Sequence, residues 1–358
     1  MTNPLRKSLT SAMYFYCNLD AAMETAVETD IENAVEDDLA VQPDDATGVG
    51  NQMRYNFKEP LQVGGQAVVE GVMMRAPQQV AVAVRKLDGS IKTHIEPFKS
   101  VLETHQWLRI PVVRGAVGLL EMMYLGIKMM NWSANETLAD YGARRKEKTD
   151  AGITCSMIAS IAVGVMFFFI LPMWIATAFV GDAGSAALFN LVSGVIRALL
   201  FLGYLTGISQ LDDVRRMFQY HGSEHKSIYA FEQHRPLTVN EAMKFTTLHP
   251  RCGTSFLLVV MTVSVFAFSF LDMVIVEKFG HINLVMRVLF HLPFIPLVGG
   301  LSYEVIKVAA RYSESAIGKV LVAPGLWLQR ITTREPDEEQ LEVALASLTA
   351  ALGTNRHG

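Results

Sequence analysis

The class of this protein is decided by residues 153–180, which read ITCSMIASIAVGVMFFFILPMWIATAFV. These 28 positions hold no charged residue, and about 20 apolar residues suffice to cross the hydrocarbon core of a bilayer. Three further apolar runs follow, the last of them interrupted by charged residues and prolines, at 186–209, 255–276 and 283–305. The sequence therefore predicts an α-helical membrane protein with about four transmembrane helices, in two pairs at 153–209 and 255–308.

The composition agrees with that class and excludes others. Hydrophobic residues make up 51% of the 358 positions and charged residues 18%, which is apolar for a soluble protein. The formal net charge is −4, so no basic excess indicates a nucleic acid partner. Three distant cysteines imply no disulfide framework. We expect no secretory signal, because the first 50 residues lack a long apolar core.

The basic residues predict how the spans are oriented, because cytoplasmic loops carry an excess of Lys and Arg. Four basic residues lie between 144 and 148, six lie between the second and third spans, and three follow the fourth span by residue 319. The two remaining turns carry only Lys278. We therefore expect a multi-pass protein of the cell (inner or plasma) membrane, in contact with the lipid bilayer, with both termini in the cytoplasm.

Residues 1–55 have the composition of an acidic tail. Ten acidic residues fall between Asp20 and Asp45. Such a segment cannot bury enough apolar surface to offset the entropy lost on ordering, so we expect disorder. An acidic docking tail is the alternative.

Residues 60–100 predict a small β-rich segment, with an antiparallel sheet near residues 62–98. Two runs rich in β-branched residues flank Asp88-Gly89, a dipeptide typical of a tight hairpin turn. Glycines at positions 64, 65 and 71 either relieve crowding between strands or let the backbone approach a ligand closely, and the first interpretation is slightly favoured.

Two amphipathic helices are expected outside the spans. In the segment 107–148, charged residues recur every seven positions at Arg114, Glu121 and Lys128, which favours an interfacial helix or one packed across the inner ends of the bundle. A core helix of a soluble subdomain is an equal alternative. In the cytoplasmic tail 309–358, residues 323–336 predict a loop with aromatic anchoring. A helix with a leucine stripe then packs on the protein or contacts a second copy in a homo-oligomer.

The chemistry of the sequence is concentrated in the stretch His221-Gly-Ser-Glu224-His225-Lys226, within the His-rich segment 210–254. On a helix, residues three and four positions apart share a face, so the two imidazoles and the carboxylate would point the same way. Two imidazoles can hold a divalent metal, most suitably zinc, while Glu224 acts as general base toward water. An amphipathic surface helix whose polar side chains face water is the alternative.

A second group of possible ligands follows in His249-Pro-Arg-Cys252-Gly. His249 and Cys252 offer a nitrogen and a sulfur at a spacing that suits a metal site. Pro250 is typical of a first helical turn, so Cys252 would stand at the N-terminus of the third span, where the helix dipole favours a thiolate. Without the neighbouring histidines, we would interpret Cys252 simply as a small apolar residue at the start of a helix.

Three further residues are weaker candidates for the site. Glu70 and Arg75 qualify only if the sheet folds against the histidines. Glu304 lies at the inner end of the fourth span, where an ionisable group is a functional hypothesis by default. It could face the metal from below, but an ion pair with Lys307, Arg311 or Arg197 is favoured.

These stretches together resemble the YqhQ-type family of bacterial membrane proteins. The resemblance covers about residues 60–350 and is carried by GGQAVVEGVMMR at 64–75, HGSEHK at 221–226, HPRCGTS at 249–255, PGLWLQ at 324–329 and TTREP at 332–336. It implies a metal-dependent enzyme in a membrane, and it implies no substrate.

Three functions follow as hypotheses. The first is a membrane-embedded, metal-dependent enzyme, a hydrolase with His221, His225 and His249 as ligands and Cys252 as a further candidate ligand. The second is a scaffold or assembly factor, in which four protein ligands close a structural metal site and leave no position for water. The third is a transporter, suggested by ionisable residues in or beside the spans, at Arg197, Asp272, Arg287, His291 and Glu304. The absence of evident internal repeats makes the transporter the weakest.

Overall fold

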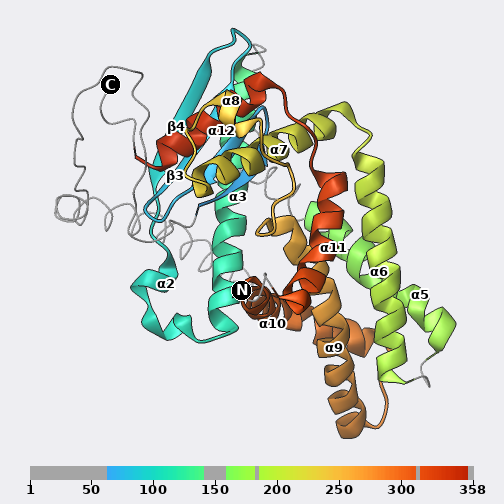
Figure 1. Ribbon diagram of the computed structural model, residues 1–358. Coiled ribbons are helices and arrows are strands. Elements are labelled where there is room, and N and C mark those ends of the chain that lie inside the picture. The colour runs from blue at the N-terminus through green and yellow to red at the C-terminus, as the bar shows by residue number, and fades with distance from the viewer. Residues whose placement is uncertain (1–62, 141–158, 182–184, 312–314, 354–358) are drawn as a thin grey trace, which may run out of the picture. The chain divides into compact units, whose positions relative to one another are not determined.

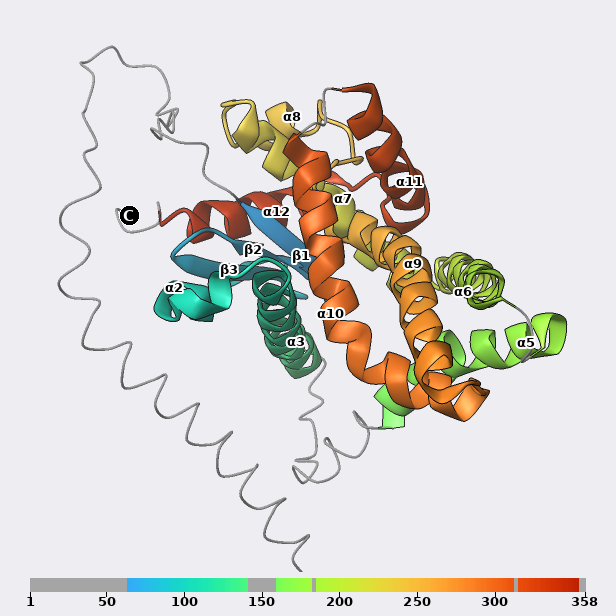
Figure 2. The same cartoon turned by 90° about the horizontal axis from the view of Figure 1, so that it is seen from below.

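The computed structural model describes residues 63–140, 159–181, 185–311 and 315–353. In these ranges a small sheet covered by helices on both faces is joined to a set of long apolar helices (Figures 1 and 2). The predicted acidic tail lies outside the described residues, as do positions 141–158.

The predicted sheet is confirmed as a four-stranded antiparallel meander in the order β1-β2-β3-β4. The strands are Gly64–Val68, Gly71–Arg75, Gln79–Arg85 and Ile91–Pro97. Gly89 has φ +83° in the turn between β3 and β4, as the Asp-Gly dipeptide predicts. A Cβ atom on Gly71 would lie 2.0 Å from the Ala83 carbonyl oxygen, so this glycine relieves crowding between strands.

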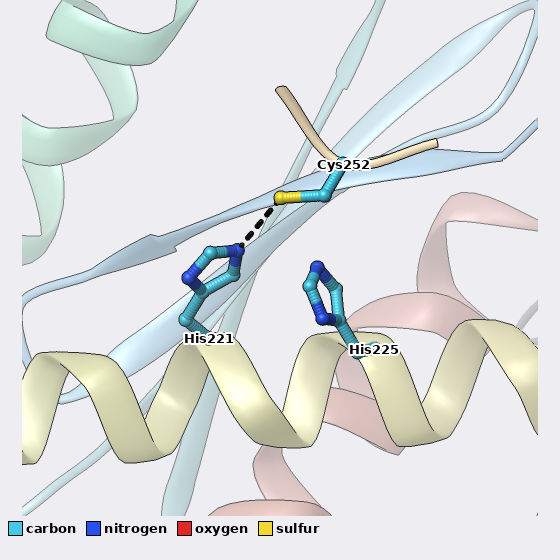
Figure 3. A group of neighbouring side chains, drawn as sticks. All are labelled: His221, His225 and Cys252. Carbon is cyan, nitrogen blue, oxygen red and sulfur yellow. Dashed lines mark hydrogen bonds between the residues drawn. The ribbon is translucent and has the colours of Figure 1, made fainter. Parts of the chain in front are cut away.

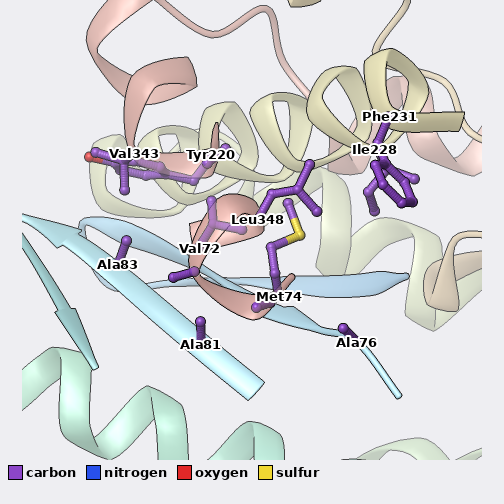
Figure 4. Packing of buried hydrophobic residues seen from close by; sticks show 13 residues of the cluster. Val72, Met74, Ala76, Ala81, Ala83, Tyr220, Ile228, Phe231, Val343 and Leu348 are labelled. Atoms are coloured by element: carbon purple, nitrogen blue, oxygen red, sulfur yellow. The ribbon is translucent and has the colours of Figure 1, made fainter. Parts of the chain in front are cut away.

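Helices cover both faces of the sheet (Figures 1 and 4). On one face α7 (Asp212–Glu232) and α12 (Glu338–Ala351) bury a core around Val72, Met74 and Leu348. The leucine stripe of the last predicted helix is therefore a packing stripe. On the other face α3 (Val113–Asp140) packs Leu125 and Met129 against the sheet.

Four helices are long and apolar enough to span a membrane, as predicted. They are Ala159–Val180, Ala186–Ile208, Phe256–Phe279 and Leu284–Ala309. The first contains the π-helical turn η2 (Met166–Ile170) followed by α5 (Leu171–Val180), and the others belong to α6 (Ala186–Ile208), α9 (Gly253–Phe279) and α10 (Leu284–Arg311). Apolar side chains such as Phe179 and Phe266, which are 79% and 72% exposed, form the surface that lipid would cover.

Helix α3 connects the sheet to the spans, after the short α2 (Val101–Thr104) and the 3-10 turn η1 (Gln106–Arg109). A Cβ atom on Gly300 of α10 would lie 2.1 Å from the carbonyl oxygen of Val112, just before α3. The two backbones therefore pack directly against each other. This helix is a core helix on its sheet side, while Leu120 and Tyr124 are exposed.

The prediction of a loop at 323–336 is wrong over most of its length. Residues up to Thr332 belong to the helix α11 (Ala316–Thr332), which contains Pro324 and packs along α9. Leu328 and Gln329 on this helix are fully buried, and such packing offsets the hydrogen bond that proline removes. Local sequence signals for a break do not include that tertiary gain. One further short helix, α8 (Val239–Ala242), follows α7.

Candidate metal centre

The two histidines of the H-x-x-E-H stretch lie on successive turns of α7 and face the same side (Figure 3). Their ring centroids are 4.5 Å apart. Cys252 approaches them from the start of α9, with its Sγ 3.2 Å from His221 Nε2. One ligand atom from each of these three residues lies within 4.8 Å of the others. We call His221, His225 and Cys252 the His/Cys site.

Backbone carbonyls fix both imidazoles of the His/Cys site. His221 Nδ1 lies 2.8 Å from the Thr332 oxygen, and His225 Nδ1 lies 2.5 Å from the Thr247 oxygen. Because a carbonyl oxygen can only accept, each Nδ1 carries the proton, which leaves Nε2 of a neutral ring as an acceptor. His225 Nε2 is buried without a partner among the described residues. The donor set therefore fits a cation between these three side chains.

Burial also keeps His225 in the form that binds metal. Desolvation lowers the pKa of His225 below its ordinary value, and the neighbouring His221 acts in the same direction, against the opposing effects of the nearby Cys252 thiol and the Thr247 carbonyl. A lowered pKa means that the ring is neutral at physiological pH. Neutral imidazole is the form of histidine that coordinates metals.

The C-terminal part of the chain holds these residues in place. A Cβ atom on Gly222 would lie 2.0 Å from the Arg334 carbonyl oxygen, so the segment 332–335 lies directly on α7 there. Gln329 accepts from the backbone N–H of His249 at 2.7 Å and donates to its carbonyl oxygen at 2.8 Å. Four of the stretches singled out in the sequence thus meet around the His/Cys site, those at 221–226, 249–255, 324–329 and 332–336.

Glu224 lies beside the same histidines but faces the sheet. Its carboxylate accepts a hydrogen bond from the backbone of Gly65, and a Cβ atom on Gly65 would lie 2.9 Å from Glu224 Cγ. Oε2 is buried without a partner in the part of the chain that the structure describes. Burial raises the pKa of Glu224 to about 7, against the opposing effects of His221 and the Gly65 hydrogen bond. Gly65 is therefore the glycine that permits a close approach.

His249, the other predicted ligand, lies next to the His/Cys site and has other partners. Its ring centroid is 5.6 Å from that of His225. Nε2 is 3.3 Å from a carboxylate oxygen of Glu232, and Nδ1 accepts from the backbone N–H of Arg251 at 3.3 Å. With both nitrogens occupied, His249 lies outside the set of three converging ligand atoms.

The weaker candidates have other positions. Glu70 forms a two-pronged ion pair with Arg216 on α7, at 2.6 Å for each contact. Arg75 lies over the Phe98 ring, on the α3 side of the sheet, with its guanidinium 4.3 Å from the ring centroid.

Glu304 forms an ion pair, as favoured, with a cation that was not among those expected. Arg114 at the start of α3 binds both carboxylate oxygens, at 2.7 and 2.6 Å. The approach of α3 to α10 at Gly300 brings these two residues together. Because Arg114 and Glu304 are 190 positions apart in the sequence, local residue spacing could not predict this contact.

Sequence reasoning missed the residues that fix the ligands. The carbonyls of Thr247 and Thr332 carry no side-chain signature, because any residue can supply a backbone oxygen. Gln329 belongs to the PGLWLQ motif, but nothing in that motif indicates which backbone it contacts. The glycine inside H-G-S-E-H was the available signal, since glycine in a helix interior indicates a close packing partner.

Comparison with known proteins places this chain among sequences without an assigned activity. A family model described as a protein of unknown function, DUF1385, matches residues 110–354. An uncharacterised protein of Bacillus subtilis strain 168, YqhQ, is 33% identical over 308 residues, which is 82% of this chain and 93% of that protein. No solved structure matches the chain. The matched region contains α7, the start of α9 and α11, which together build the His/Cys site.

Proposed function

The chain belongs to the DUF1385 family, whose function is unknown, and we propose that it is a membrane-embedded, metal-dependent hydrolase with its centre at the His/Cys site. One observation carries this proposal. Two imidazole Nε2 atoms and one thiol converge, and each imidazole is already oriented through its Nδ1. Proteins that bind catalytic metals orient ligand histidines in this way.

Zinc is the ion that suits these ligands best. Imidazole nitrogen together with thiolate sulfur is a typical zinc ligand set, whereas calcium and magnesium prefer oxygen. When bound, zinc supplies Lewis acidity that activates water near neutral pH. His221, His225 and Cys252 would hold it.

The number of ligands favours an enzyme over a structural site. Catalytic zinc has three protein ligands and one open position, whereas structural zinc has four protein ligands. His249 would be the fourth ligand, but Glu232 and the Arg251 N–H occupy its two nitrogens. Arg251 also pairs with Glu232, which holds that carboxylate beside His249.

Glu224 is the residue that we assign to proton transfer. A general base works best when its pKa is close to the working pH, and burial raises the pKa of Glu224 to about 7. Its Oε2 has no partner among the described residues, so it is available to take a proton. His221 acts on the pKa of Glu224, and this electrostatic interaction supports the assignment.

A structural metal staple is the second candidate. Its support is that the His/Cys site joins elements far apart in sequence, since His221 contacts both Cys252, 31 positions away, and Thr332, 111 positions away. An ion there would stabilise the contact of α7 with α9 and α11. The staple would need a fourth protein ligand, so the coordination number separates the two functions.

The test is elemental analysis of the purified protein with X-ray absorption at the zinc edge. We expect stoichiometric zinc in the wild type, with two nitrogens, one sulfur and one light atom from solvent. His225→Ala should lose the metal. His234→Ala is the matched control, because His234 is an exposed residue just past the end of α7 and should leave the metal content unchanged.

Glu224→Gln separates catalysis from folding. Because Glu224 is not in the ligand set, this variant should keep its metal and its melting temperature while losing any hydrolytic activity found for the wild type. Wild-type protein without a stoichiometric transition metal would refute the proposal. Four protein ligands in the absorption spectrum would favour the staple instead.

A further inference from the structure

Helix α3 is not one of the four candidate spans found in the described residues, but it carries an exposed apolar face. Its large exposed side chains recur at three- and four-residue spacing, so they lie along one side of the helix. The turn η1 and the residue after it add two more. We call this set the α3 apolar face, and each member is between 47% and 67% exposed: Trp107, Ile110, Leu120, Met123, Tyr124 and Ile127.

The α3 apolar face points away from the sheet. On the sheet side of the helix, Leu125 and Met129 are buried. Successive residues of a helix turn by about 100°, which places Leu120, Tyr124 and Ile127 on nearly the opposite side. Helix α3 therefore separates the sheet from whatever covers the exposed face (Figure 2).

The exposed apolar surface of α3 adjoins that of the candidate span α10. A Cβ atom on Gly115 would lie 2.7 Å from Tyr303 Cβ, and one on Gly299 would lie 3.1 Å from Leu119 Cδ2. Tyr303 and Leu119 are themselves 40% and 39% exposed. Lipid that covers this part of α10 would therefore also reach α3.

The two charged residues in the first half of α3 already have partners. Arg114 donates to both carboxylate oxygens of Glu304 on α10. Glu121 accepts from the Ser100 hydroxyl at 2.8 Å and from the Val101 N–H at 2.5 Å. Charged groups beside hydrocarbon are normally satisfied in this way, so neither residue excludes contact with lipid.

Polar residues mark both ends of the α3 apolar face. Lys128 follows Ile127 directly and donates to Glu96 of β4 at 2.7 Å. Asn131 is exposed two turns after Tyr124, on the same side of the helix. At the other end, Arg109 is exposed. A helix that crossed the bilayer would place one of these ends in hydrocarbon, whereas a helix lying along the surface keeps both in water.

We propose that the α3 apolar face lies in the bilayer at the boundary between headgroups and acyl chains, so that α3 forms a layer between the sheet and the membrane. Interfacial helices bury an apolar face about 5–10 Å into this boundary. Trp107 and Tyr124 are of the two residue types that are enriched there. The sheet is then attached to the membrane through α3 as well as through the chain that leads to the spans.

Nitroxide labels on the full chain, reconstituted in phosphatidylcholine vesicles, test the proposal. The background carries Cys17→Ser and Cys155→Ser, and without an added cysteine it corrects for labelling of Cys252. Collisions of the label with oxygen, which dissolves in hydrocarbon, are compared with collisions with a nickel chelate, which stays in water. We expect the oxygen-to-nickel ratio to be several-fold higher at Leu120→Cys and Tyr124→Cys than at Asn131→Cys. Asn131→Cys is the matched control, because it is exposed on the same side of α3.

Trp107→Cys tests whether the helix lies along the surface, and we expect its ratio to equal that of Tyr124→Cys. A ratio at Trp107→Cys as low as that at Asn131→Cys would overturn this orientation. Free access of the nickel chelate to Leu120→Cys and Tyr124→Cys would show water on the face and overturn the proposal. Shielding of both labels from both probes would also overturn it. Dipolar broadening between labels would then identify a second copy as the cover, and its absence would identify another part of this chain.

Discussion

The residues of the H-G-S-E-H stretch have different roles. Gly222 tolerates a side chain least, because a Cβ atom there would meet the Arg334 carbonyl oxygen. The histidines present ligand atoms, whereas the glycine allows the 332–335 segment to lie on α7. The Arg334 backbone N–H also donates to the Phe218 carbonyl oxygen at 2.9 Å, which fixes the register of this contact. The orientation of His221 through the Thr332 carbonyl therefore depends on the absence of a side chain at position 222.

We predict that Gly222→Ala weakens metal binding without removing a ligand. The added methyl group would displace the Arg334 carbonyl and with it the Thr332 oxygen that orients His221. Crowding of this kind costs about 1–3 kcal/mol of stability. Zinc titration and thermal melting measure the two effects. Gly207→Ala on α6 is the control, because its Cβ would meet nothing within 4 Å. Equal behaviour of the two variants would contradict this role for Gly222.

At the level of residues, the sequence was informative about side chains and uninformative about their partners. Spacing alone predicted that His221 and His225 share a face, because the helical period determines it. Helix-start chemistry brought Cys252 into consideration. The partner of Glu304 and the second partners of His249 depend on contacts between distant elements. A local sequence pattern does not predict those contacts.

Among the elements, α12 is the one that completes the part of the fold built on the sheet. Its N-terminus has a capping box, in which Asp337 accepts from the Gln340 N–H at 2.7 Å and Gln340 accepts from the Asp337 N–H at 3.1 Å. Leu341, Leu345 and Leu348 then face the core. The helix packs on β2, β3 and β4, on the sheet face that α7 also contacts, and β2 pairs with β1, the strand that carries Gly65.

We predict that Leu348→Ala destabilises this part of the protein by about 2–5 kcal/mol, the usual effect of emptying a filled core position. Leu348 is completely buried against the sheet. Thermal melting and limited proteolysis near residue 336 would report the loss. Leu87→Ala is the matched control, since Leu87 is 61% exposed. If the two variants have the same melting temperature, α12 does not stabilise the sheet.

Elements with a strong local signal were predictable, and those decided by packing were not. The hairpin around Gly89 and the four apolar runs follow directly from turn chemistry and length. Helix α11 passes through Pro324 because its buried face packs on α9. The π-helical turn before Pro172 also escaped prediction, and its Phe168 carbonyl is the one that Arg197 uses.

For the whole molecule, the distribution of basic residues predicts that the soluble part and the His/Cys site share the cytoplasmic side. We expect a membrane-impermeant maleimide to label His281→Cys in intact cells, because the turn between α9 and α10 would face outward. Gln233→Cys, at the end of α7, should react only after permeabilisation. Both positions are exposed.

The background for this labelling carries Cys17→Ser and Cys155→Ser and retains Cys252. That background without added cysteine is the control for labelling of Cys252 itself. If Gln233→Cys is labelled in intact cells while His281→Cys is protected, the predicted orientation in the membrane is wrong.

The paired hydrogen bonds between Gln329 and His249 have a consequence for biosynthesis. Translation proceeds at about 5–20 residues per second, so the 80 positions between these residues take roughly 4–16 s to make. During that interval the histidine-bearing helix has already been synthesised, while the glutamine that holds its neighbouring loop does not yet exist. The histidines of the proposed metal centre are therefore made before the residue that holds their neighbouring loop, so we expect the proposed metal to bind selectively only after synthesis is complete.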